Sequence, residues 1–338
     1  MVINNTNKMT NEDIKEQVEY LKKELNAVVL VHTYQKQEVQ ELGDFVGDSL
    51  GLCIEASKTN ADTIIFCGVR FMAESAKLLN PEKQVILAER HSGCPMADMI
   101  NADILKTKRK EYPNSIVVCY VNSSAAVKAE SDICCTSSNA ETIINSIEET
   151  KDIFFIPDTH LASYTAERTG REIIRWPGYC PTHAKILPEF IEIQKREHPQ
   201  AAVCVHPECS HATRSKADFI GSTEAIFRFC SDSTEYTEFI IGTEQGILSR
   251  LKKANPEKSF FSPATTAVCP NMKRTNAALV LRILRYLREK GEDVQFHEMD
   301  SQKDKLPFEI IELNEETANK AKKPIQKMME ISNIQTRS

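Results

Sequence analysis

Two patterns of apolar and polar residues follow one another repeatedly along this chain. Residues 11–25 place apolar side chains at spacings of four, three and four, which predicts an amphipathic helix. Residues 27–31 are Ala-Val-Val-Leu-Val, a continuous apolar run that is typical of a strand buried on both faces. Similar runs predict further strands at 63–67, 84–88, 115–120, 133–135, 153–156, 201–205, 218–220, 239–241, 259–261 and 294–296.

Helical patterns separate these strands, for example at residues 71–79 and 271–290. Strands that alternate with helices over short connections indicate parallel sheets covered by helices on both faces. The predicted fold class is therefore α/β. In such sheets, ligands bind at the carboxyl ends of the strands.

The same plan occurs three times. The first strand of each unit ends at His32, Tyr120 or His206, which are 88 and 86 positions apart. Self-similarity at a fixed period indicates repeated structural units. We therefore expect three similar αβα domains in a pseudo-threefold arrangement around a central site. They are residues 1–109, residues 110–197, and residues 198–338 with a C-terminal helix and tail.

Composition narrows the class of protein. Of the 338 residues, 41% are hydrophobic and 27% are charged, which is typical of a soluble globular protein. The net charge of −6 and pI near 5.9 argue against a general nucleic-acid binder, which needs a basic excess. The apolar runs are too short to span a membrane, and the N-terminus lacks the apolar core of a secretory signal. We expect a cytoplasmic protein.

Three of the eleven cysteines, Cys94, Cys180 and Cys269, directly precede a proline, and they are 86 and 89 positions apart. Because proline favours the first turn of a helix, each thiol is predicted at a helix start, where its pKa would be lowered. Three such thiols suit an iron–sulfur cluster with one open iron, or a zinc site that adds His183. The alternative is three inert buried cysteines.

Other polar residues at strand ends are candidates for proton transfer and substrate binding. His206 and Glu208 flank Pro207 after a buried strand, and with His32 and Tyr34 they could move protons. Serine and threonine residues after short turns, including Ser49, Ser137, Ser222 and Thr223, could bind carboxylate or phosphate groups. Ordinary helix capping is the alternative for these hydroxyls, and a structural role is the alternative for any single histidine.

Several long motifs follow one another in a specific order, nearly from end to end of the chain. They are VQELGDFVGDSL at 39–50, FCGVRFMAE at 66–74, GCPMAD at 93–98, YVNS at 120–123, WPGYCPTH at 176–183, VHPEC at 205–209, GST at 221–223 and CPNMK at 269–273. In these motifs and their order, the chain resembles quinolinate synthase, the A protein of de novo NAD biosynthesis.

The resemblance implies a 4Fe–4S cluster held by Cys94, Cys180 and Cys269, with an open iron that acts as a Lewis acid. It implies condensation of iminoaspartate (iminosuccinate) with dihydroxyacetone phosphate to quinolinate, phosphate and water. Glu208 would be the main acid/base residue, helped by His206 and Tyr34. The implied substrate contacts are His32, Ser49, Tyr120, Val121, Asn122, Ser137, His206, Pro207, Glu208 and Thr223.

The resemblance also suggests a monomer or homodimer, with a functional link to an aspartate oxidase or dehydrogenase that makes the imine. Two positions depart from the family's usual pattern, because Thr33 and His160 stand where tyrosine and asparagine are common. An iron–sulfur redox or oxygen sensor, or another cluster-dependent hydro-lyase, remains the alternative function.

Overall fold

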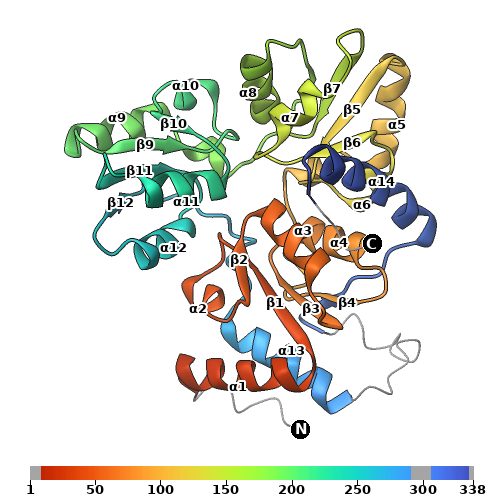
Figure 1. Ribbon diagram of the computed structural model, residues 1–338, viewed down its shortest axis with the longest axis vertical. Helices are drawn as coiled ribbons and strands as arrows, with labels where there is room; N and C mark the ends of the chain where they lie inside the picture. The colour runs from red at the N-terminus through yellow and green to blue at the C-terminus, as the bar shows by residue number, and fades with distance from the viewer. Residues whose placement is uncertain (1–8, 291–305, 335–338) are drawn as a thin grey trace.

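The computed structural model describes residues 9–290 and 306–334, and these form three separate sheets with helices packed around them (Figure 1). The first sheet has the order β13–β4–β3–β1–β2, with β1 (Ala27–His32), β2 (Phe45–Gly47), β3 (Thr63–Cys67), β4 (Gln84–Leu87) and β13 (Glu309–Ile310). The second has the order β6–β5–β7–β8, with β5 (Ser115–Tyr120), β6 (Ile133–Cys135), β7 (Asp152–Ile156) and β8 (Ile174–Arg175). The third has the order β10–β9–β11–β12, with β9 (Ala202–Val205), β10 (Phe219–Ile220), β11 (Glu238–Gly242) and β12 (Ser259–Phe261).

All three sheets share one order of strands. The first strand of each lies between the second and the third, and every described pair is parallel except β13 with β4. The predicted α/β class with parallel sheets is therefore confirmed. The pseudo-threefold arrangement and the domain boundaries at 109/110 and 197/198 stay predictions.

Helices cover the sheets and begin where polar side chains cap them. Thr10 and Asp13 form a reciprocal capping box at the first helix, and Asp48 accepts from the Gly51 N–H at the third. The helices are α1 (Asn11–Glu24), α2 (Gln37–Gln40), α3 (Ser49–Lys58), α4 (Arg70–Leu79), α5 (Ala102–Glu111), α6 (Ala125–Ala129), α7 (Ala140–Asn145), α8 (Thr159–Thr169), α9 (Pro188–Glu197), α10 (His211–Arg214), α11 (Thr223–Asp232), α12 (Ile247–Ala254), α13 (Ala277–Lys290) and α14 (Glu315–Ile331).

The last part of the chain returns to the first two sheets. Helix α13 packs against α1, β13 lies on the edge of the first sheet, and α14 covers α6 and β6 of the second (Figure 1). The apolar core follows this course, since Leu281 and Leu284 are buried with Val18 of α1. Among the described residues, none of the helices is both long and apolar enough to cross a membrane.

Most predicted strands are confirmed. The differences are of two kinds: an observed strand that the sequence did not predict, and a predicted strand that lies outside the described residues. Strand β2 was not predicted, because three residues between Gly43 and Asp48 are too short to show a pattern. The predicted strand at 294–296 lies outside the described residues.

The predicted helices directly after the Cys-Pro pairs are wrong in their starting points. Short 3₁₀ turns follow two of the cysteines, at Ala97–Met99 and His183–Lys185, and turns occupy residues 270–274 after the third. Helices α5, α9 and α13 each begin eight residues after the cysteine. The repeat is real, but the element that follows each cysteine is a tight turn.

Candidate active site

One cavity collects side chains from all three sheets. It encloses about 690 Å³, counting space open to solvent, which suits a small organic ligand. Almost every residue predicted for the site lines it; Val121 and Pro207 do not. The predicted residues that line it are His32, Tyr34, Ser49, Cys94, Tyr120, Asn122, Ser137, Cys180, His206, Glu208, Thr223 and Cys269.

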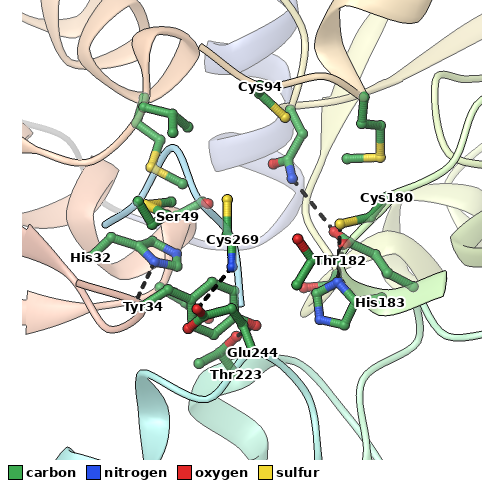
Figure 2. A pocket seen from close by; sticks show the side chains of 18 of the residues that line it. His32, Tyr34, Ser49, Cys94, Cys180, Thr182, His183, Thr223, Glu244 and Cys269 are labelled. Atoms are coloured by element: carbon green, nitrogen blue, oxygen red, sulfur yellow. Dashed lines mark hydrogen bonds and ion pairs between the residues drawn. The ribbon is translucent and has the colours of Figure 1, made fainter. Parts of the chain in front are cut away.

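The three Cys-Pro cysteines reach this cavity from different sides (Figure 2). Cys94, Cys180 and Cys269 are partly buried, whereas the other eight cysteines are buried. A single zinc ion would need their sulfur atoms close together, since each Zn–S bond is about 2.3 Å long. Among the described residues, the three sulfur atoms and His183 do not form a group whose ligand atoms all lie within 4.8 Å of one another. Thiols spread around one cavity fit a larger, multi-iron group.

The pKa values of these thiols differ from the sequence prediction. Burial raises the pKa of Cys94 to about 12, although backbone N–H groups of Ala97 and Met96 act in the opposite direction. Burial also raises the pKa of Cys180 and of Cys269. The predicted lowering by a helix start is therefore wrong for the metal-free protein. A metal group would have to displace the thiol protons on binding.

One compact set of ligand atoms is present beside the cysteines. Cys180, His183 and Glu208 each offer an atom within 4.8 Å of the others. His183 Nδ1 lies 2.8 Å from Glu208 Oε2 and 3.2 Å from Cys180 Sγ. The site could thus hold a metal ion at this point as well.

Glu208 is the central buried acid of the cavity. Tyr120 OH donates to its Oε1 over 2.6 Å, and Asn122 Nδ2 lies 3.5 Å from the same oxygen. Burial opposes ionisation, but His183, His206 and Tyr120 together hold the pKa of Glu208 well below its usual range. The carboxylate is therefore charged and can accept a proton only from a strong acid or during reaction.

A chain of hydrogen bonds links this carboxylate to Tyr34. His183 Nε2 lies 2.9 Å from Thr243 Oγ1, which lies 2.7 Å from Tyr34 OH. Tyr34 OH also lies 2.7 Å from Thr223 Oγ1. In the neutral tautomer with the proton on Nδ1, His183 donates to Glu208 and accepts from Thr243, so Tyr34 donates to Thr243. Burial raises the pKa of Tyr34, which keeps it a proton donor.

His32 and His206 occupy equivalent positions with equivalent geometry. His32 Nδ1 accepts from the backbone N–H of Tyr34 over 3.1 Å, and His206 Nδ1 accepts from that of Glu208 over 3.2 Å. Burial lowers the pKa of each histidine to about 3. Both rings are therefore neutral with Nε2–H as the donor, which suits holding a carboxylate more than shuttling protons.

Sequence reasoning missed three residues of this site. His183 was considered only as a zinc ligand, and neither Thr243 nor Glu244 was assigned a role. Both follow strand β11, so the rule that ligands bind at strand ends could have found them. His160, which departs from the family pattern, is half-buried, and its carbonyl accepts from Arg214 rather than lining the cavity.

The buried histidines predict a loss of stability in acid. Their pKa is about 3 in the folded chain and near 6.5 when unfolded, so the unfolded state binds more protons between these values. The free energy of unfolding of the metal-free protein should fall as pH drops through this window, by at most about 1.4 kcal/mol per pH unit for each histidine.

Urea denaturation at several pH values measures this effect. Replacing both His32 and His206 with glutamine should flatten the slope between pH 6.5 and 5, whereas His211→Gln, at a side chain that is 70% exposed, should not. An equal slope in the double variant and the wild type would contradict the prediction.

Comparisons with known proteins agree on one family. The family model described as "Quinolinate synthetase A protein" matches residues 16–330. The chain is 47% identical to quinolinate synthase from Alkaliphilus metalliredigens over 84% of this chain and 96% of the relative. It is 43% identical to quinolinate synthase 2 from Methanosarcina acetivorans over 96% of this chain and 97% of the relative. A quinolinate synthase from Methanosarcina barkeri is 48% identical over 81% and 89% of the two chains.

Proposed function

The chain belongs to the quinolinate synthase family, and from that premise we propose that it condenses iminoaspartate with dihydroxyacetone phosphate. The products are quinolinate, phosphate and water. The observation that carries the proposal is the shared cavity, where three separated cysteines face a charged glutamate and a buried tyrosine joined by hydrogen bonds.

Cys94, Cys180 and Cys269 would hold a 4Fe–4S cluster. The support is the donor set, since three thiols line one cavity and, among the described residues, do not all lie within 4.8 Å of one another. When bound, such a cluster with one iron free of cysteine supplies a Lewis acid for a hydroxyl or carboxylate oxygen of the substrate.

Glu208 takes a proton from the condensing substrates, and Tyr34 supplies one to the oxygen that leaves. The hydrogen-bond chain through His183 and Thr243 joins these two groups and holds both in place. Because these hydrogen-bonded side chains are buried, water that would otherwise hydrolyse the imine is excluded. Tyr120 keeps Glu208 in place by donating to Oε1.

Neutral donors and amides bind the substrates. The Nε2–H groups of His32 and His206 donate to carboxylate oxygens. Asn122 Oδ1 is buried and has no hydrogen-bond partner among the described residues, so a substrate donor would satisfy it. Ser49 at the start of α3 and Thr223 at the start of α11 bring backbone N–H groups that favour phosphate or carboxylate.

A turnover assay under argon tests the proposal. Protein reconstituted with iron and sulfide should form quinolinate from dihydroxyacetone phosphate and iminoaspartate generated in place by an aspartate oxidase. Omitting either substrate, or using the metal-free protein, should give none. A fully loaded cluster without quinolinate would exclude the proposal and favour a sensor or another hydro-lyase. Equal iron and sulfide contents distinguish a cluster from a single ion bound at Cys180, His183 and Glu208.

A further inference from the structure

Glu244 is a fully buried carboxylate that the proposed reaction does not use. It follows strand β11, lines the cavity, and its side chain is 0% exposed. Oε1 accepts from the backbone N–H of Cys269 over 3.0 Å, and Oε2 accepts from that of Gly246 over 2.6 Å. Figure 2 shows Glu244 beside Cys269, with the hydrogen bond drawn. Both oxygens are thus occupied by the protein.

Lys273 links Glu244 to the backbone of Tyr34. Its Nζ lies 2.9 Å from Glu244 Oε1 and also donates to the carbonyl oxygen of Tyr34. Gly246 lies against the same loop, since a Cβ at this position would meet the Tyr34 Cα at 2.6 Å. One partly buried ion pair therefore contacts both the backbone of Cys269, through Glu244, and the backbone of Tyr34, through Lys273.

The second sheet offers the same arrangement at the equivalent strand. Asp158 follows β7 at the position that Glu244 occupies after β11, two residues beyond the strand. It is fully buried, and the backbone N–H of Cys180 donates to it. Val69 stands at this position in the first sheet. The segment before Cys94 is contacted differently, since Asn271 Nδ2 donates to the carbonyl oxygen of Gly93 over 2.8 Å.

We propose that Glu244, through its ion pair with Lys273, is a positioning residue that sets Cys269 relative to Tyr34. Cys269, which would hold the cluster, and Tyr34, which would deliver the proton, are thereby positioned by the same ion pair. This inference rests on the proposed function. Groups that orient metal ligands in this way commonly change metal affinity by 10- to 100-fold when they are replaced.

The test compares Glu244→Gln, Lys273→Met and the double variant after reconstitution with iron and sulfide. In each single variant, the chelator concentration that removes half the iron should fall about 10- to 100-fold. The double variant should lose no more than the worse single variant, because either single change already breaks the ion pair. Wild-type iron retention in Glu244→Gln, or losses that multiply in the double variant, would overturn the proposal.

Two controls separate positioning from general damage. Lys273→Arg keeps the charge and should retain iron nearly as the wild type does. Glu192→Gln makes the same chemical change in an exposed ion pair with Lys216, 2.7 Å long, and should change nothing.

Kinetics supply a second measurement. Turnover per bound cluster should fall in Glu244→Gln while KM changes little, because neither Glu244 oxygen is open to substrate. A larger effect on KM than on kcat would contradict positioning. A wild-type protein that binds no cluster would instead overturn the proposed function itself.

Discussion

Cys94→Ala, Cys180→Ala and Cys269→Ala should each abolish both the visible absorbance of the cluster and quinolinate formation. Among the described residues that line the cavity, each thiol is the one cysteine from its segment, so no neighbouring thiol can replace it. The remaining two ligands would leave the cluster open on two sides. Iron and sulfide content after reconstitution, together with the absorption spectrum, measures the loss.

A buried cysteine elsewhere provides the matched control. Cys53 lies in α3, is 5% exposed and does not line the cavity, so Cys53→Ala should keep the cluster. Wild-type iron content in Cys94→Ala, Cys180→Ala or Cys269→Ala would remove the replaced cysteine from the ligand set. Loss of the cluster in Cys53→Ala would show that the spectrum reports general unfolding instead.

Glu208→Gln should lower kcat by about 10² to 10⁴ while the cluster stays bound. The change keeps the size of the side chain and leaves an acceptor for Tyr120, but it removes the charged carboxylate that would take the proton from the substrates. Single-turnover assays on protein with matched iron content measure the effect.

Tyr120→Phe is the comparison for Glu208→Gln, because it removes one hydrogen bond to Glu208 and leaves the carboxylate in place. Its kcat should fall by about tenfold to a hundredfold, as for a single hydrogen bond to a charged group. Equal losses in the two variants would mean that orientation of Glu208, not its charge, limits the reaction. An unchanged kcat in Glu208→Gln would exclude Glu208 as the base.

The sequence could predict most strands and nearly all of the cavity, because buried parallel strands leave continuous apolar runs and their ends carry polar residues. Strand positions at 27–31 and 115–120 match β1 and β5 closely. The 86- and 89-residue spacings of the Cys-Pro pairs likewise indicated a shared site, and the cavity does contain all three cysteines.

The parts of the site that the sequence did not predict depend on contacts between segments, which a pattern along the chain cannot show. Glu208, after strand β9, is paired with His183, which lies 25 positions earlier in the chain, after strand β8 of the second sheet. Only the fold brings these two side chains together. Thiol pKa values also escaped prediction, since burial outweighs the backbone N–H groups around Cys94. The Glu244–Lys273 pair has no periodic pattern, so its role follows only from distances.

The course of the last residues bears on how the protein folds during synthesis. Helix α13 packs against α1, strand β13 extends the first sheet, and α14 covers the second, so both early units depend on residues made after the third sheet. Contacts between such distant segments are slow to form, because a long loop must close before they add stability. The first two units therefore leave the ribosome with apolar faces uncovered, and these exposed faces are where chaperone binding or aggregation would begin.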